Sequence, residues 1–221
     1  MPCDKTDNDM RVYLTFDDGP IPIITEQILD VLKEYNIKAT FFVVGKQIPG
    51  RERILKRIYK EGHSIGLHTY SHKYTKQYYS DDALIKEMLK TREQIHGVLG
   101  ISPSIIRFPG GSMNRLSGDL LAKLHSNNMR VFDWNVDIQD GKNGSTPVNK
   151  LVRNAETFKP GYTRNIILAH TNSTNINTVK ALPEIIKYYK GLSYEFVPIL
   201  DNTPEYYFKF KQPVHTNNKP N

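Results

Sequence analysis

Two short segments carry side chains suited to binding a metal ion and moving a proton. Asp17 and Asp18 are adjacent and precede Gly19-Pro20, and His68 and His72 lie four positions apart. Two imidazoles at that spacing bind one metal from a helical turn or from a loop. A carboxylate from either aspartate completes a His-His-Asp set that leaves positions open for water. Asp, Gly and Pro also favour plain turns, so the first segment alone does not decide between a site and a solvated loop.

A third segment, which begins at Arg107, combines a cation with permissive backbone. An arginine at the end of a strand can hold a carboxylate through two parallel hydrogen bonds. Gly110 and Gly111 allow backbone N–H groups to approach a ligand closely. An ordinary exit from a strand into a loop has the same composition and stays an alternative.

Two more polar groups adjoin apolar runs. Asp133, Asn135 and Asp137 alternate along the chain, which predicts that they share one face of a strand while Trp134 takes the other. That face is either a wet site or part of an edge strand. His170 ends an apolar run, where a lone histidine is more often a structural hydrogen-bonder. It gains interest because we expect Asp137 to orient its ring and raise its pKa.

The elements that must position these groups are predicted from hydrophobic periodicity, which alternates between strands and helices along the chain. Strands are predicted over 12–16, 39–44, 64–67, 105–108, 130–136, 165–169 and 195–199. Helices are predicted over 24–35, 54–62, 81–99 and 116–127, from 146 onward, and over 178–190. Ser80 is the expected N-cap of the longest helix, and Thr146-Pro147 is expected to open a later one.

This alternation predicts an α/β fold with a parallel sheet, either a barrel or an open doubly wound sheet. Every polar cluster described above follows a predicted strand, and the C-terminal ends of such strands build one face where active sites form. An open sheet usually carries a glycine-rich phosphate turn after its first strand. Here Asp17-Asp18 stand at that position and would repel a phosphate, which favours the barrel.

Composition excludes several classes of protein. A chain of 221 residues with 38% hydrophobic residues suits one folded domain, and Cys3, its single cysteine, excludes internal disulfides and cysteine-based zinc clusters. The net charge is +7, but no run of about five or six basic residues appears, so we expect no nucleic-acid partner. No apolar stretch approaches the ~20 residues of a membrane span. The first ten residues are polar and do not resemble a signal peptide.

Five motifs in order resemble those of the polysaccharide deacetylases, the fourth carbohydrate esterase family, also called the NodB homology domain. They are TFDDGP, HTYSH, RFPGG, the aspartate in WNVD, and ILAH. The resemblance is closest in look to bacterial peptidoglycan N-acetylglucosamine deacetylases, and it implies a distorted (β/α)₇ barrel, in agreement with seven predicted strands. It assigns residues 11–200 to the catalytic domain, 1–10 to a polar N-terminal extension and 201–221 to an irregular C-terminal tail.

The resemblance also implies a role for each matching residue. Asp17 would be the general base, oriented and kept ionised by Arg107, and His170 the general acid, tuned by Asp137. The implied metal ligands are Asp18, His68 and His72. The implied substrate contacts are Pro109 and Gly110 in the groove, with a backbone N–H for the oxyanion, Leu168 in the pocket for the acetyl methyl group, and Trp134 as an aromatic wall.

The implied activity is metal-dependent hydrolysis of the acetamide of N-acetylglucosamine in peptidoglycan. The metal is divalent, with zinc expected first and cobalt, manganese, nickel or iron as alternatives. Relatives that act on N-acetylmuramic acid often replace the second aspartate with asparagine, and Asp18 is intact. Gly141 stands where many members have tryptophan, and Thr171 where many have aspartate; both departures bear on substrate preference.

Four other functions stay open. A chitooligosaccharide deacetylase or an acetylxylan esterase would use the same site, and a non-catalytic glycan-binding wall protein would keep only the fold. A metal phosphodiesterase would more often need two metals and further ligands. The resemblance implies a monomer that acts on an acetylated glycan outside the cytoplasm or at the cell wall.

Overall fold

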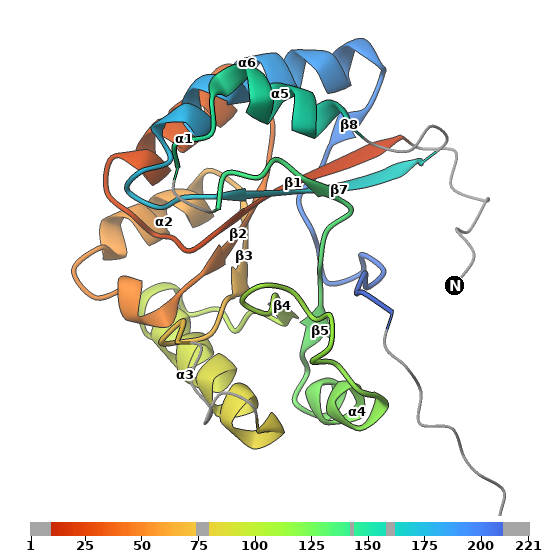
Figure 1. The fold of residues 1–221 in the computed structure, drawn as a ribbon. Helices are drawn as coiled ribbons and strands as arrows, with labels where there is room; N and C mark the ends of the chain where they lie inside the picture. Colours follow the sequence, from red (N-terminus) through yellow and green to blue (C-terminus); the bar gives the residue numbers. More distant parts are fainter. Residues whose placement is uncertain (1–9, 74–79, 142–143, 158–161, 210–221) are drawn as a thin grey trace, which may run out of the picture.

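The computed structural model describes residues 10–73, 80–141, 144–157 and 162–209. Its centre is a curved parallel sheet with helices packed around it (Figure 1). The strands are β1 (Arg11–Asp17), β2 (Thr40–Val43), β3 (Ser64–Leu67), β4 (Ile105–Ile106), β5 (Arg130–Val131), β6 (Val136–Asp137), β7 (Arg164–His170) and β8 (Glu195–Phe196). They lie in the order β5-β4-β3-β2-β1-β7-β6, and β8 pairs with the start of β1.

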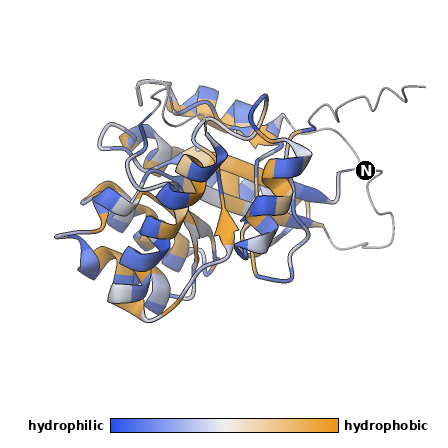
Figure 2. Cartoon of the chain, turned by 90° about the horizontal axis from the view of Figure 1, so that it is seen from below, coloured by the Kyte–Doolittle hydropathy of each residue, from blue (hydrophilic) through white to orange (hydrophobic). Residues whose placement is uncertain are grey.

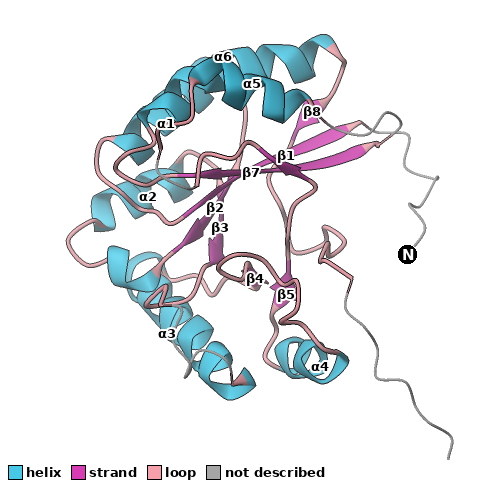
Figure 3. Ribbon diagram, in the orientation of Figure 1, coloured by secondary structure: helices cyan, strands magenta, loops and turns pink. Residues whose placement is uncertain are grey.

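The helices form the outer layer of this distorted (β/α)₇ barrel, so the predicted fold class is confirmed (Figure 3). They are α1 (Ile24–Glu34), the short 3₁₀ helix η1 (Gly45–Gln47), α2 (Glu52–Lys60), α3 (Asp81–Leu99), α4 (Gly118–Ser126), α5 (Val148–Glu156) and α6 (Ile176–Gly191). Among the described residues, no helix combines the length and apolar character that crossing a bilayer requires.

The strands are apolar on both faces because both faces are buried. Ile167 and Ala169 of β7 belong to the large cluster that includes the helix residues, whereas Ile166 packs with Tyr13 and Phe42 in a smaller cluster. Successive residues of a strand point to opposite faces, so the two clusters fill the two sides of the sheet. Figure 2 shows the apolar strands at the centre and polar residues on the outside of the helices.

The predicted strand over 130–136 is interrupted, and its polar residues explain why. Asp133 accepts hydrogen bonds from the backbone N–H groups of Ser112 at 3.0 Å and Phe208 at 2.8 Å. Asn135 donates to the carbonyl of Arg164 at 2.8 Å and accepts from the N–H of Ile166 at 2.7 Å. These side chains take the place of sheet hydrogen bonds, so the predicted strand appears as two short ones, β5 and β6. Asp133 and Asn135 are therefore structural.

The helix boundaries follow the sequence signals with one exception. The hydroxyl of Ser80 accepts a hydrogen bond from the N–H of Ala83 at 3.2 Å, which confirms it as the N-cap of α3. The helix expected from 146 begins at Val148 with Pro147 in the N-cap position. Thr146 does not cap it, because its hydroxyl donates to the carbonyl of Gln139 at 2.9 Å instead.

The segment 201–209 packs against the barrel beside β5. Phe132 and Tyr206 form a parallel bridge, and the N–H of Asp133 donates to the carbonyl of Tyr206 at 2.6 Å. Phe208 meets Trp134 edge to face, with 5.2 Å between ring centroids. This part of the chain after Asp201 thus contributes to the wall next to the polar strand ends.

Candidate active site

The adjacent carboxylates at the end of β1 face one cavity. Asp17 is the last residue of β1 and pairs in register with Phe42 on one side and His170 on the other. Asp18 then adopts a left-handed backbone conformation with φ 77°, which aspartate tolerates better than most residues. This turn cancels the alternation of a strand, so both side chains line a cavity of ≈ 460 Å³.

The two histidines reach the same cavity from a loop after β3, which settles the choice between helical turn and loop. Thr69 and His72 have positive φ angles of 61° and 51°, so the segment cannot be a helical turn. One carboxylate oxygen of Glu87 on α3 accepts hydrogen bonds from the N–H groups of Tyr70 at 3.1 Å and Ser71 at 2.6 Å. Glu87 thus holds the loop in place, a role that nothing in its sequence context indicated.

Asp18, His68 and His72 fit a metal ion. Their ligand atoms lie within 4.8 Å of one another. The Oδ1 atom of Asp18 is buried without a hydrogen-bond partner among the described residues, 3.2 Å from His72 Nε2 and 3.6 Å from His68 Nε2. An orphaned carboxylate oxygen facing two imidazole nitrogens is costly unless a cation lies between them. Asp17 lies beside this set, with its Oδ2 3.7 Å from His68 Nε2.

The protonation of these ligands suits metal binding. His68 Nδ1 lies 2.9 Å from the carbonyl of Arg107, which can only accept, so Nδ1 carries the hydrogen and Nε2 presents its lone pair. Burial and the neighbouring His68 lower the pKa of His72, against the charge of Asp18, and this favours a neutral ring. Burial alone would raise the pKa of Asp18, but the charges of His68, His72 and His170 and a bond from Asn172 lower it.

Arg107 is completely buried and binds Asp17 through one described hydrogen bond, instead of the two parallel bonds considered from the sequence. Its Nη1 donates to Asp17 Oδ1 at 3.0 Å and to the hydroxyl of Thr15 at 2.6 Å. Its Nε donates to the carbonyl of Phe132 at 2.7 Å, and its Nη2 to that of Asp133 at 3.1 Å. All three nitrogens of the guanidinium are hydrogen-bonded, which fixes its position and therefore that of the Asp17 carboxylate.

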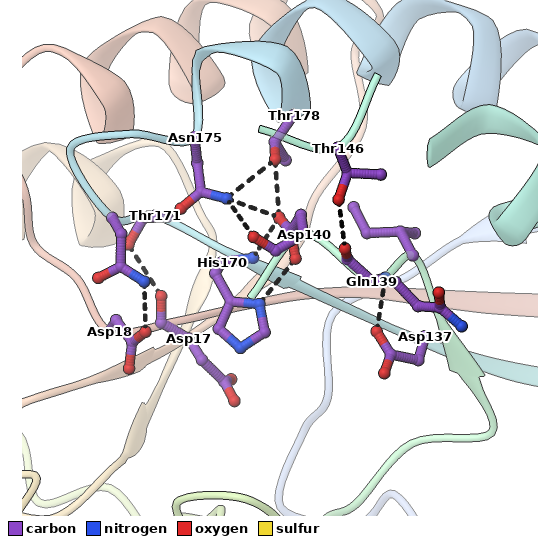
Figure 4. A network of polar contacts seen from close by, with 12 residues as sticks. Asp17, Asp18, Asp137, Gln139, Asp140, Thr146, His170, Thr171, Asn175 and Thr178 are labelled. Atoms are coloured by element: carbon purple, nitrogen blue, oxygen red, sulfur yellow. Dashed lines mark hydrogen bonds and ion pairs between the residues drawn. The ribbon is translucent and has the colours of Figure 1, made fainter. Parts of the chain in front are cut away.

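His170 is oriented by Asp140, not by Asp137. Its Nδ1 lies 2.7 Å from Asp140 Oδ1, and its backbone N–H donates to Asp140 Oδ2 at 2.9 Å. The buried carboxylate also accepts from the Thr178 hydroxyl at 2.7 Å and from Asn175 Nδ2 at 3.2 Å (Figure 4). The remaining ring nitrogen, Nε2, is the one that Asp140 leaves available.

The surroundings of His170 favour its protonated form. Burial by itself lowers the pKa of the ring, but the hydrogen bond and charge of Asp140, with the charges of Asp17 and Asp18, outweigh it and raise the pKa to about 9. At neutral pH the ring is therefore an imidazolium, which is the form a general acid requires.

The expectation that Asp137 orients the ring of His170 is wrong because the chain turns after β6. Asp137 is the end residue of β6 and accepts a hydrogen bond from the N–H of Gln139 at 2.7 Å. Gln139 has a left-handed φ of 62°, and the turn through it brings Asp140 under His170. Asp140 stands three positions after Asp137, just beyond the WNVD motif. Strand alternation pointed to Asp137 because it cannot anticipate this turn.

The predicted substrate contacts reach the cavity with one exception. Gly110, Trp134 and Leu168 line it, whereas Pro109 is buried beside it and is not among the lining residues. Sequence reasoning missed Asn172, whose amide donates to Asp18 Oδ2 at 2.8 Å. Its place two residues after His170 was the only signal.

These groups match a known family. The model of the family described as polysaccharide deacetylase matches residues 4–129, more than half of the chain. The chain belongs to the polysaccharide deacetylase family. The protein is accordingly a hydrolytic polysaccharide deacetylase, and its family is metal-dependent.

Relatives and solved structures agree with this membership. The deacetylase is 36% identical over 196 residues to a peptidoglycan-N-acetylglucosamine deacetylase of Bacillus cereus, covering 87% of this chain and 68% of that protein. It is similar in structure to a polysaccharide deacetylase from Bacillus cereus, with a TM-score of 0.79, 30% identity, and coverage of 95% of this chain and 98% of the other. The catalytic domain of a peptidoglycan N-acetylglucosamine deacetylase from Eubacterium rectale gives a TM-score of 0.83 at 29% identity, with 93% and 96% covered.

Proposed function

We propose that this deacetylase hydrolyses the acetamide of N-acetylglucosamine residues in peptidoglycan and depends on one divalent metal ion, zinc in the first instance. One observation carries the proposal. A three-ligand metal set, an uncoordinated carboxylate and a protonated histidine face the same cavity. A set of three protein ligands leaves room for water and substrate, as in catalytic metal sites.

Asp18, His68 and His72 would hold the metal, and Asp17, which Arg107 binds through Oδ1, would stay outside the ligand set. Bound there, a divalent cation supplies Lewis acidity toward the acetamide carbonyl and lowers the pKa of water. Arg107 occupies Asp17 Oδ1, so Oδ2 is the oxygen that turns toward His68. Asp17 Oδ2 is therefore placed to accept a proton from the water that attacks the carbonyl carbon.

His170 completes the reaction as proton donor. When the carbon–nitrogen bond breaks, the leaving sugar nitrogen needs a proton, because an amide anion is a very poor leaving group. Asp140 holds His170 by Nδ1, so the proton is delivered from Nε2. Water has then added to the acetyl carbon, and the products are acetate and a glucosamine residue.

Two other lining residues suit the acetyl group. Gly110 has a φ of 73° and no side chain to block its N–H, so its backbone can approach the carbonyl oxygen. An oxyanion-directed N–H of this kind is worth about 3 kcal/mol in the transition state. Leu168 lines the same cavity and offers an apolar contact for the methyl group.

The choice of peptidoglycan rests on the relatives named above, on the intact Asp18, and on a net charge of +7 that suits an anionic wall. A peptidoglycan substrate implies that the enzyme acts outside the cytoplasm. Chitooligosaccharides and acetylxylan are the competing substrates, since the same groups cleave an amide or an ester. The complete set of polar groups in the cavity favours catalysis over a role confined to glycan binding.

A substrate panel tests the proposal. The zinc-loaded protein is incubated with peptidoglycan, chitin oligosaccharides and acetylxylan, and acetate and free amines are measured. We expect the highest kcat/KM on peptidoglycan, with one amine formed for each acetate released. Faster release from chitin oligosaccharides or acetylxylan would contradict the substrate, and no release from any of them would contradict the activity.

A further inference from the structure

The carboxylate of Asp18, the proposed metal ligand, needs a contact that fixes its orientation, because a carboxylate on a turn can rotate. Only its Oδ1 faces the imidazole nitrogens of His68 and His72. The backbone does not impose this orientation, since Asp18 lies just beyond the end of β1 with φ 77°. Some other contact must decide which of its oxygens meets the histidines.

Asn172 makes that contact. Its Nδ2 donates to Asp18 Oδ2 at 2.8 Å, whereas Asp18 Oδ1 has no hydrogen-bond partner among the described residues. The amide thus occupies one oxygen and leaves the other for the cation. An N–H₂ group only donates, so it cannot compete as a ligand through that atom.

Thr171 fixes the distance between the two strand ends. Its backbone N–H and its hydroxyl both donate to the carbonyl of Asp17, at 3.0 and 2.9 Å, and its side chain is fully buried. This double contact ties the end of β7 to the end of β1, immediately before Asn172 and Asp18 (Figure 4). The backbone that carries Asn172 is therefore held in place relative to Asp18.

We propose that Asn172 is a positioning residue for the metal site, which holds Asp18 Oδ2 so that Oδ1 points at the cation. The inference rests on the proposed metal-dependent function. Partners that orient metal ligands in this way typically contribute about 10- to 100-fold in metal affinity. The same effect is expected from Asn172, in the absence of any substrate.

The test compares Asn172→Leu with a matched control, Asn177→Leu. Asn177 lies five positions later, is partly buried like Asn172, and makes its amide hydrogen bond to the carbonyl of Thr146 at 3.1 Å. Metal-free proteins are titrated with Zn²⁺ against a chromophoric chelator, and the visible spectrum of the Co²⁺ forms reports the ligand geometry. Thermal unfolding of the metal-free proteins checks that they are folded; Asn172→Ala serves if the leucine variant is not.

We expect Zn²⁺ to bind Asn172→Leu about 10- to 100-fold more weakly than the wild type, with an altered Co²⁺ spectrum, and Asn177→Leu to match the wild type. Unchanged affinity and spectrum in Asn172→Leu, while the wild type binds Zn²⁺ and releases acetate, would overturn this inference alone. An equal loss in both variants would show a general structural effect and overturn it too. If the wild type itself binds no Zn²⁺, the proposed function falls together with it.

Discussion

Replacing Asp140 with asparagine tests how His170, the proposed general acid, is kept protonated. The side chain keeps its shape but loses the charge that His170 Nδ1 contacts at 2.7 Å. The pKa of His170 lies at about 9 against an ordinary 6.5, and this difference corresponds to roughly 3 kcal/mol in favour of the charged ring. The hydrogen bond and the charge of Asp140 are the two largest contributions to this increase, so most of the increase should disappear in Asp140→Asn.

The assay is the pH profile of kcat/KM on an N-acetylglucosamine oligomer. This profile reports the essential groups of the free enzyme. In the wild type we expect activity to fall at a basic pH, above the ordinary pKa of histidine, where His170 loses its proton. In Asp140→Asn the basic limb should move toward the ordinary pKa of histidine, near 6.5. Asp137→Asn is the comparison variant, because Asp137 bonds Gln139 and acts on His170 through its charge alone, so the basic limb of this variant should move much less than that of Asp140→Asn.

The free energy of unfolding should also depend on the protonation of His170. A pKa raised on folding stabilises the protein fully below the unfolded value, near 6.5, and this stabilisation is lost as the pH rises through about 9. The free energy of unfolding of the wild type should therefore decline across this range by up to roughly 3 kcal/mol, and that of Asp140→Asn should decline much less. A basic limb of the pH profile that does not move in Asp140→Asn, or that moves only in Asp137→Asn, would refute the role of Asp140 in keeping His170 protonated.

Three other substitutions have distinct expected outcomes. Asp17→Asn should retain one Zn²⁺ per chain by elemental analysis while acetate release falls by about 100-fold or more, since the proton acceptor is gone; loss of zinc would instead make Asp17 a ligand. His68→Ala should lose the metal in the same analysis, and an unchanged zinc content would show the ligand set to be wrong. Gly141→Ala should lower kcat, because the added Cβ would lie 2.6 Å from His170 Cε1 and push the ring from its place; a wild-type kcat and pH profile would contradict this.

The barrel was predictable from sequence because its strands are buried on both faces and read as continuous apolar runs. Ile166 and Ile167 point to opposite sides of the sheet, yet both are apolar, which marks β7 plainly. Asp17, Asp18, His68 and His72 were predictable for a related reason. They directly follow such runs, and the ends of parallel strands meet at one face.

The rest of the site depends on turns and long-range contacts that periodicity does not encode. Asp140 reaches His170 only through the left-handed turn at Gln139, so strand alternation pointed to Asp137. Asn172 contacts Asp18, 154 positions away in the chain, and neither residue alone indicates that pairing. Contacts of this kind follow from the pairing of β7 with β1 and with β6, which brings distant parts of the chain together, and not from local propensity.

The most direct test of the central claim is a titration of metal-free protein with Zn²⁺ while acetate release from peptidoglycan is followed. If Asp18, His68 and His72 hold the metal on which hydrolysis depends, the rate should rise from near zero and level off at one Zn²⁺ per chain, and a strong chelator should reverse it. A rate that is already maximal without metal, or fully metallated protein that releases no acetate, would contradict the claim.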